Sequence, residues 1–553
     1  MLLEEQFMKV ASKYPDNIAI ASDDKSISYS ELADAVLYCR DNIIRKISDK
    51  RIGLIADQNT DAIIFLMATV FAGKAIVPID PRQGIDDINA MLQELTSTVL
   101  IDDTFQERGS KLTFYRLSDL LKKSNVTLDD RDAIYSGHDS DAYILHTSGT
   151  TGRPKPVLAS AASLHWVSNE LAAAYHVKKD SSVIQFAYLS FDSAFVEIWS
   201  TLLTGATLII PGGSIRENLY GTLRAVARSY SNLTLTLPPS VAENLDESIL
   251  GSIETLILAG EELSSVVANS LVGRVGHLIN AYGPTESIIC ATTFEITEQI
   301  RGRVPIGKPL NGMKIVLDSN NNEMLLYSSY LAEGYLGIKD DSSFLSDKDG
   351  RYYKTGDVAI LDERGNYTFT GRTDRQIKVN GQRVELEGLE SKLRNGTNNS
   401  QVYLLAPHMD SKRIKLYCLY VNAGLYGNTL LNSFLPKGIS LTGSLKIPKT
   451  PLNRNGKVDY KELESLLNDH HEVYVSKTAD SSYESMIQIW HDVFGKEEII
   501  NGDTPFFEIG GDSLIALKLV SLINDEYSIE LKLIDIINND TPEMLIKLLK
   551  QRL

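Results

Sequence analysis

The sequence predicts an α/β protein whose large first region is built on doubly wound sheets, and three observations support this. Apolar, strand-like runs alternate with helical patterns through most of the 553 residues. One strand, at 277–281, runs into a Gly-Pro turn, the kind of place where open α/β sheets bind ligands. The last segment, about 482–553, shows helical spacing, which predicts a separate helix-rich unit.

Composition narrows the class of protein. A chain of 553 residues is long enough for about three or four domains, and 43% hydrophobic residues is ordinary for a globular protein. A net charge of −17 argues against nucleic acid or an anionic membrane as the main partner, although any soluble acidic protein would also have it. The longest apolar run, near 63–72, is too short for a bilayer, which needs about 20 residues.

Cysteine usage and the first residues predict a cytoplasmic location. The three cysteines, Cys39, Cys290 and Cys418, have neither disulfide-framework nor metal-ligand spacing, which is typical of a reducing compartment. The opening MLLEEQFMKV is acidic and lacks a basic region, so we expect no signal peptide.

The first elements are expected to form core and turns. Residues 51–56 and 75–81 are strand-like and enclose an apolar helix at 62–73, which is the alternation of an α/β sheet. Before them, Ser30 precedes a helical pattern that starts at Leu32 and is a candidate N-cap.

The stretch 143–157 is the first candidate for chemistry. An apolar run suited to a buried strand leads into small hydroxyl and glycine residues and then to Lys155. Glycine lets backbone N–H groups converge on an anion, and hydroxyls and a lysine add donors and charge, so polyphosphate is the expected guest. The spacing is not that of a P-loop, and a flexible polar loop is the alternative. The loop residues are Thr147, Ser148, Gly149, Thr150, Thr151 and Gly152.

A lone carboxylate follows the next helix and strand, predicted at 164–176 and 183–189. Asp192 lies among apolar and aromatic neighbours, where a charge is costly unless it is paired. It is either a buried binding group or the cap of a helix at 193–203.

The following strands, at 233–238, 253–258 and 277–281, alternate with helical spans. The last of them leads into Asn-Ala-Tyr-Gly-Pro-Thr-Glu at 280–286, which in isolation could be a surface turn. Further on, Thr355-Gly356-Asp357 is a common turn whose carboxylate has two oxygens that suit a vicinal diol.

The C-terminal third has one linker and one unusual helix start. Residues 468–481 are polar and unpatterned, as linkers are, and helices are predicted at 483–494 and 514–524. Between those helices, Gly-Gly-Asp-Ser at 510–513 exposes a hydroxyl near the positive end of a helix, a suitable place for a phosphodiester. The alternative is that Asp512 or Ser513 only caps the helix.

These motifs together resemble a known family. TSGTTGRPK at 147–155, the 280–286 motif, YKTGD at 353–357, GRTDRQIK at 371–378 and FFEIGGDSL at 506–514 are similar to motifs of nonribosomal peptide synthetase adenylation domains fused to a peptidyl carrier protein. The resemblance covers nearly the whole chain. It implies an adenylate-forming N-terminal subdomain at 1–373, a small α+β C-terminal subdomain at 374–468, a linker at 469–481 and a helical-bundle carrier domain at 482–553.

The resemblance also implies roles for individual residues. Lys457, in the Asn-Gly-Lys turn near 455, would stabilise charge together with Thr285 and Lys155, although an exposed turn of this kind is also common. Tyr282 would stack on adenine, Asp357 and Arg372 would hold the nucleotide with the 147–152 loop, and Glu286 would bind Mg²⁺. Asp374 would be a hinge between subdomains, and Ser513 would carry 4′-phosphopantetheine. The implied cofactors are thus ATP, Mg²⁺ and 4′-phosphopantetheine.

The same resemblance gives a substrate class. Asp192 would bind the α-ammonium of an amino acid, a group that aryl-acid and fatty-acid activators do not need to recognise. Besides Asp192 and Lys457, no charged residue is expected to line the substrate pocket. Charged substrate side chains are therefore disfavoured, and a large aromatic or apolar amino acid is expected. The other lining residues would be Ser193, Val196, Thr236, Ile257, Ala259, Ala281, Ile289 and Cys290, in which Ser193 and Val196 depart from the phenylalanine pattern.

Three departures and two alternatives accompany this interpretation. Proline follows Lys155 where the family has glycine, and 320–335 and 434–447 lack the usual family segments; we expect both to be surface connections away from ligands. The expected partners are the amino acid, a phosphopantetheinyl transferase and downstream condensation or tailoring enzymes. The alternatives are a CoA ligase for an acid without an amine and a carrier scaffold with an inactive adenylation unit.

Overall fold

The structure is a computed structural model in which the chain separates into two compact units. Unit 1 comprises Met1–Thr147, Pro154–Gly212 and Ala225–Asp374, and unit 2 comprises Ser148–Arg153, Gly213–Arg224 and Arg375–Leu553. The structure describes all residues of 1–553 except 24, 93–94, 104, 106–111, 122–139, 148–153, 212–217, 339–341, 374–375, 380–381, 398–400, 407–415, 422–430, 432–433, 436–438, 440, 442, 452–457, 459, 470–480, 495–499, 503, 508, 512, 528–530 and 553.

The first sheet of unit 1 is mainly parallel and has the strand order β15-β14-β13-β12-β11-β9-β10-β1-β2 among the described residues. Its central strands run parallel from β13 to β1, while β2, β14 and β15 are antiparallel to their neighbours. The strands are β1 (Ile18–Ser22), β2 (Ser26–Ser28), β9 (Ser182–Ile184), β10 (Thr207–Ile210), β11 (Leu233–Leu237), β12 (Ile253–Ala259), β13 (His277–Tyr282), β14 (Thr292–Glu295) and β15 (Lys308–Pro309).

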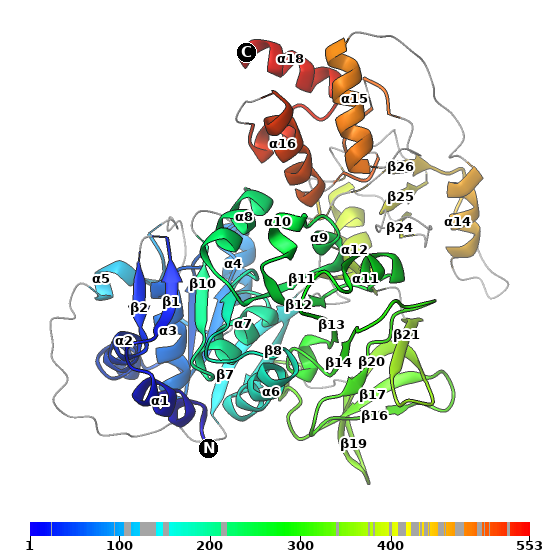
Figure 1. Ribbon diagram of the computed structural model, residues 1–553. Coiled ribbons are helices and arrows are strands. Elements are labelled where there is room, and N and C mark those ends of the chain that lie inside the picture. Colours follow the sequence, from blue (N-terminus) through cyan, green and yellow to red (C-terminus); the bar gives the residue numbers. More distant parts are fainter. Residues whose placement is uncertain are drawn as a thin grey trace. The chain divides into compact units, whose positions relative to one another are not determined.

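The second sheet has the order β18-β8-β7-β4-β3-β5-β6. Helices α2 (Tyr29–Asn42), α3 (Thr60–Phe71), α6 (Ala161–Ala174) and α7 (Asp192–Leu202) pack with the two sheets (Figure 1). Apolar side chains from these helices share one buried core with side chains of both sheets. This layered arrangement confirms the predicted α/β class, because helices cover an apolar face of each sheet. The strands are β3 (Arg51–Ile55), β4 (Ala75–Ile79), β5 (Thr98–Ile101), β6 (Thr113–Arg116), β7 (Asp141–Thr147), β8 (Lys155–Ser160) and β18 (Gly334–Tyr335).

The helices of this region follow the predicted pattern with shifted ends. The predicted strand 183–189 ends already at Ile184, and the helix α2 is capped by Ser28 rather than by Ser30. Ser28 and Glu31 form a reciprocal capping box, which satisfies two backbone donors at once. The helices are α1 (Leu3–Lys13), α2 (Tyr29–Asn42), η1 (Ile44–Lys46), α3 (Thr60–Phe71), α4 (Ile85–Leu92), α5 (Leu117–Leu121), α6 (Ala161–Ala174), α7 (Asp192–Leu202), α8 (Leu219–Ser229), α9 (Pro239–Ala242), α10 (Glu247–Leu250), α11 (Ser265–Leu271) and η2 (Thr285–Ser287).

A third, five-stranded sheet corrects one expectation. Its strands are β16 (Lys314–Leu317), β17 (Glu323–Tyr327), β19 (Phe344–Asp347), β20 (Gly350–Leu361) and β21 (Tyr367–Arg372). The segment 320–335, expected to be a surface connection, contains β17 and β18. Met324 and Leu326 are fully buried in the core of this sheet, because alternate residues of a strand point to the same face.

Unit 2 contains a small α+β region. A two-stranded sheet, β22 (Gln376–Val379) with β23 (Gln382–Glu385), precedes helix α12 (Leu386–Thr397) and the strands β24 (Val402–Leu405), β25 (Tyr417–Tyr420) and β26 (Gly443–Lys446); α14 (Tyr460–Asp469) follows. The expectation that 434–447 is a surface connection is also wrong. Ile439 and Leu441 are buried there, and β26 pairs in parallel with β25.

The helical end of the chain has a core of its own. Helices α15 (Ser481–Phe494), α16 (Ser513–Tyr527), α17 (Leu533–Asn538) and α18 (Pro542–Arg552) enclose Trp490 and Phe506, which are fully buried. The predicted helix-rich unit is therefore confirmed. Within the described part of the chain, no helix has the length and hydropathy needed to cross a membrane.

Candidate active site

Strands β7 and β8 flank the predicted phosphate loop. Thr147 is the last residue of β7, Lys155 is the first of β8, and the two are cross-strand partners in this antiparallel pair. Lys155 therefore lies beside Thr147. The loop residues between them, Ser148, Gly149, Thr150, Thr151 and Gly152, lie outside the described residues, as do the predicted hinge Asp374 and the predicted catalytic Lys457.

The turn after β13 brings the next predicted residues together. A Cβ on Gly283 would lie 2.5 Å from the Cα of Cys290, so the chain can fold back here only with glycine. The short helix η2 then carries Thr285 and Glu286. Immediately after it, Ile288 and Ile289 have φ values of 61° and 73°, a left-handed conformation that is strained for β-branched residues. The buried side chain of Ile288 helps the surrounding core to hold this conformation.

Asp192 is the first residue of α7, and its carboxylate makes a long-range contact. Thr285 Oγ1 donates a hydrogen bond of 2.7 Å to Asp192 Oδ2, across 93 residues of sequence. The N-cap of α7 is Phe191, which makes no side-chain cap hydrogen bond, and Asp192 is the next residue along the helix. The alternative interpretation of Asp192 as a helix cap is therefore wrong. The hydrogen bond instead connects Asp192 with Thr285, for which separate roles were predicted.

The predicted lining residues gather at the carboxyl ends of parallel strands. Thr236 is the register partner of Ile257 between β11 and β12, and Ala259 is the partner of Ala281 between β12 and β13. Because these positions alternate along their strands, their side chains share one face of the sheet. Val196, Ile257, Ala281 and Cys290 belong to one buried core, Ala259 and Ile289 pack against it, and Ser193 follows Asp192 in α7.

The thiol among these residues is electrically neutral. Burial raises the pKa of Cys290 to about 12, so the thiol carries no charge near neutral pH. Burial, with a further contribution from the Cys290 thiol, also raises the pKa of the neighbouring Tyr175 phenol. The nearby Asp192 carboxylate adds to both of these pKa shifts.

Asp357, the predicted ribose ligand, is held by two other predicted nucleotide residues. It accepts hydrogen bonds from the Tyr282 hydroxyl and from the Arg372 guanidinium, and it is the cross-strand partner of Arg372 between β20 and β21. Burial, followed by the nearby Asp357 carboxylate, raises the pKa of Tyr282, so the phenol stays protonated and donates. Residues from three separate motifs therefore meet at one carboxylate.

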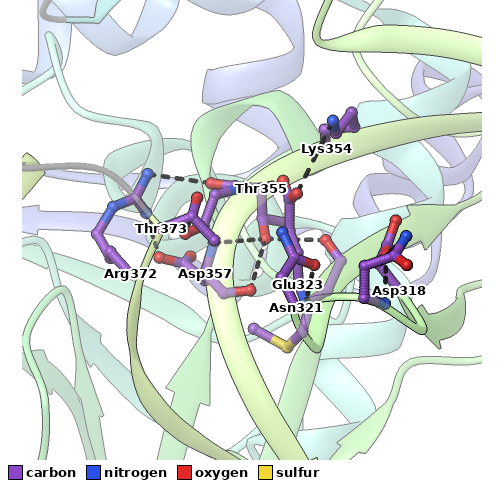
Figure 2. A network of polar contacts seen from close by, with 11 residues as sticks. Asp318, Asn321, Glu323, Lys354, Thr355, Asp357, Arg372 and Thr373 are labelled. Carbon is purple, nitrogen blue, oxygen red and sulfur yellow. Dashed lines mark hydrogen bonds and ion pairs between the residues drawn. The ribbon is translucent and has the colours of Figure 1, made fainter. Parts of the chain in front are cut away.

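A second carboxylate supports the backbone beside Asp357 (Figure 2). Glu323 Oε1 accepts a 2.9 Å hydrogen bond from the backbone N–H of Gly356, whose φ is 72°. Thr355 Oγ1 donates to the carbonyl of Met324 at 2.9 Å, and Arg372 donates to the carbonyl of Thr355 at 3.1 Å. No sequence motif indicated Glu323, because its contact with Gly356 depends on the pairing of β17 with β20, which no local signal predicts.

Glu286, the predicted magnesium ligand, is fully buried. Its Oε1 accepts a 2.6 Å hydrogen bond from the Tyr335 hydroxyl. The Lys155 ammonium lies 5.0 Å from the centroid of the same tyrosine ring. Tyr335 was not expected at the site, because it belongs to the segment that was expected to be a surface connection.

The surroundings of the cofactor residues fit the implied groups. A carboxylate such as Glu286 is the hard oxygen ligand that Mg²⁺ prefers. At the other predicted attachment point, the 15-residue helix α16 begins at Ser513, so backbone N–H groups at its start suit a phosphodiester. Gly510 has a φ of 86°, and a Cβ on Gly511 would lie 2.3 Å from the Phe506 carbonyl oxygen, so this turn requires glycine.

Comparisons with known proteins agree with this arrangement. Residues 7–336 match the family described as AMP-binding enzyme, and residues 484–549 match the family described as phosphopantetheine attachment site. The chain is 29% identical over 577 residues to gramicidin S synthase 1 of Brevibacillus brevis, covering 99% of this chain and 52% of that protein. It is 30% identical over 582 residues to bacitracin synthase 3 of Bacillus licheniformis, covering 99% of this chain and 9% of that protein.

A solved structure has the same organisation. The holo form of PA1221, an NRPS protein containing adenylation and PCP domains bound to a vinylsulfonamide inhibitor, superposes with a TM-score of 0.81 at 25% identity. The match covers 100% of this chain and 96% of that one. The present chain spans about half the length of gramicidin S synthase 1 and a small part of bacitracin synthase 3. On these grounds the chain belongs to the AMP-binding enzyme family and also carries a phosphopantetheine attachment region.

Proposed function

We propose that this protein activates an amino acid with ATP, as an aminoacyl adenylate, and transfers it to a phosphopantetheine thiol carried by Ser513. The observation that carries the proposal is the 2.7 Å hydrogen bond from Thr285 to Asp192. It joins a carboxylate suited to an ammonium ion with a hydroxyl suited to a phosphate. The match of residues 7–336 supports the activation step, and the match of residues 484–549 supports the transfer step.

The Asp192–Thr285 contact favours an amino acid over other carboxylic acids. The ammonium and carboxylate of an α-amino acid are attached to the same carbon atom. A substrate whose ammonium binds Asp192 therefore presents its carboxylate close to Thr285, where we place the α-phosphate. A CoA-ligase substrate without an amine would make no charge-assisted contact with Asp192.

Positioning and electrostatics would provide the catalysis of the first step. A carboxylate oxygen of the substrate attacks the α-phosphorus of ATP, and the bond to pyrophosphate breaks; this step requires no side-chain nucleophile. Thr285 donates to the α-phosphate, Lys155 and Lys457 stabilise the developing negative charge, and Asp357 binds the ribose diol. Magnesium held by Glu286 would neutralise charge on the phosphate oxygens.

Loading of the carrier is the second step. A rotation about Asp374 would remove Lys457 from the reaction centre and admit the carrier. Ser513 would hold the 4′-phosphopantetheine arm, whose thiol would take the aminoacyl group from the adenylate while AMP leaves. The proposed partners are therefore a phosphopantetheinyl transferase, which attaches the arm, and downstream condensation or tailoring enzymes, which use the loaded amino acid.

The proposed substrate is a large aromatic or apolar amino acid. Apart from Asp192 and Lys457, the proposed lining residues are apolar or neutral, and Val196 of α7 stands where the phenylalanine pattern has tryptophan. Val196→Trp should therefore shift selectivity toward smaller side chains, as measured by amino-acid-dependent ATP–pyrophosphate exchange across the twenty amino acids. Unchanged selectivity would show that Val196 does not line the substrate pocket.

Intact-mass spectrometry of the full chain tests the whole proposal. The protein is first treated with a phosphopantetheinyl transferase and CoA, then with Mg-ATP and an amino acid pool. We expect a phosphopantetheine adduct at Ser513, followed by an added aminoacyl mass that identifies the substrate. An adduct without acyl mass, and without exchange for any amino acid, would support the carrier scaffold with an inactive adenylation unit instead.

A further inference from the structure

We propose that Tyr335 is a positioning residue that holds the Glu286 carboxylate and the Lys155 ammonium in place for a magnesium-bound nucleotide. The inference rests on the proposed function, because it assigns magnesium to Glu286 and phosphate to Lys155. It adds a residue from a segment that sequence motifs did not connect with the site.

The first observation is the direct contact with Glu286. The Tyr335 hydroxyl donates a 2.6 Å hydrogen bond to Oε1 of a carboxylate that is fully buried. A metal-binding carboxylate is usually oriented by such an outer partner, which also fixes which oxygen points toward the metal. Tyr335 thus restricts the rotation of the Glu286 side chain.

The second observation is that the same ring carries Lys155. The Lys155 ammonium lies 5.0 Å from the centroid of the Tyr335 ring, within the range of a cation–π interaction. Lys155 begins β8, directly after the predicted phosphate loop. One phenol therefore contacts the predicted magnesium ligand through its hydroxyl and the predicted phosphate-binding lysine through its face.

The backbone around Tyr335 is also fixed to both neighbours. Tyr335 pairs with Val157 between β18 and β8, and the N–H of Ala332 donates to the carbonyl of Glu286 at 3.0 Å. The Arg351 guanidinium donates to the carbonyls of Ala332 and Glu333, at 2.6 and 3.0 Å. The segment before Tyr335 is therefore joined to the strand that carries Lys155 and to the turn that carries Glu286.

Two substitutions separate the two contacts. Tyr335→Phe removes the hydroxyl and keeps the aromatic face, so it should weaken the support of Glu286 and keep the contact with Lys155. Tyr335→Leu removes both, so it should also disturb Lys155. Tyr367→Phe is a matched control, because Tyr367 is 8% exposed like Tyr335, lies in the same unit, and donates to the carbonyl of Ile315 at 3.0 Å, away from Glu286.

Calorimetric titration of the full chain with ATP, with magnesium or with EDTA, provides a readout that does not depend on turnover. For Tyr335→Phe we expect about a 10- to 100-fold loss of the magnesium-dependent gain in ATP affinity, with affinity in EDTA unchanged. For Tyr335→Leu we expect an additional loss of affinity in EDTA. Tyr367→Phe should keep the wild-type ratio of the two affinities, even if its thermal midpoint falls.

The possible failures are distinguishable. If wild-type protein gains no ATP affinity from magnesium, the assignment of Glu286 in the proposed function is wrong. If the wild type does gain affinity and Tyr335→Phe keeps the whole gain, the positioning role of Tyr335 is wrong while the proposed function stands. An equal loss of the magnesium-dependent gain in ATP affinity in Tyr335→Phe and Tyr367→Phe would likewise show that Tyr335 has only a structural role.

Discussion

Among single residues, Asp192 has the most specific predicted effect. The carboxylate accepts from Thr285 and lies beside apolar side chains, so an ammonium ion is the charge that best compensates it. A charge-assisted hydrogen bond contributes about 1.5–3 kcal/mol. Asp192→Asn should therefore lower kcat/KM for the amino acid about 10- to 100-fold in the exchange assay and leave ATP affinity unchanged.

Asp246→Asn is a suitable control for this substitution. Asp246 caps the helix α10 through hydrogen bonds from the N–H groups of Ser248 and Ile249, and asparagine retains that cap. The control should keep wild-type exchange. A full rate in Asp192→Asn would show that the carboxylate does not bind the substrate ammonium.

His146, the residue before Thr147, makes stability depend on pH. Burial lowers its pKa to about 4, whereas an unfolded histidine has a pKa of about 6.5. Between these values the unfolded chain binds a proton that the folded chain does not, so stability decreases as the pH falls from 6.5 toward 4. The full difference corresponds to about 3 kcal/mol.

Replacement of this side chain tests that pH dependence. His146→Gln cannot be protonated, so its thermal unfolding midpoint should fall less than that of the wild type between pH 6.5 and pH 4. The measurement is a series of thermal unfolding curves at constant ionic strength. Parallel profiles of the two proteins would exclude His146 as the source.

Among the strands, β17 supports the turn that carries Asp357, the proposed ribose ligand. It carries Glu323 beside the turn Thr355-Gly356-Asp357, and the Glu323 carboxylate accepts from the N–H of Gly356. Loss of that acceptor leaves a partly buried N–H without its partner, at a cost of about 1–3 kcal/mol. Glu323→Ala should therefore weaken ATP binding about 10-fold, measured by calorimetry, while the exchange KM for the amino acid stays constant.

A carboxylate at the other end of the β20–β21 hairpin provides the comparison. Asp362 accepts from the N–H groups of Arg364 and Asn366 in the connecting turn. Asp362→Ala removes a similar turn contact far along the strand from Asp357, so it should leave ATP affinity unchanged. Equal losses in both variants would mean that general destabilisation, rather than the Gly356 contact, sets the affinity.

For the whole molecule, the main prediction is that the two chemical steps can be separated. Ser513 lies at the start of a helix with its own buried core, and the predicted adenylation residues of unit 1 lie in other elements. Ser513→Ala should abolish the phosphopantetheine adduct and the acyl mass completely. Amino-acid-dependent exchange should continue at the wild-type rate, and an adduct on the variant protein would place the attachment elsewhere.

Much of this organisation could be predicted because its signals are contiguous. The alternation of strands and helices, the 282–286 turn and the Gly-Gly-Asp-Ser helix start are each contained in a few neighbouring residues. The roles of the loop 148–152, of Asp374 and of Lys457 stay predictions, since these positions lie outside the described residues. The boundary at 373–374 and the later domain limits likewise stay predictions.

The sequence by itself determined the α/β class, the helical end and the residue types that suit an amino acid, a nucleotide and a phosphodiester. Only the tertiary structure decided which of these residues meet. Asp192 and Thr285 are 93 positions apart, Glu323 reaches Gly356 through strand pairing, and Tyr335 reaches Glu286 from a segment expected at the surface. The physical reason is that a motif records local backbone and side-chain chemistry, whereas contacts between distant residues depend on strand register and core packing.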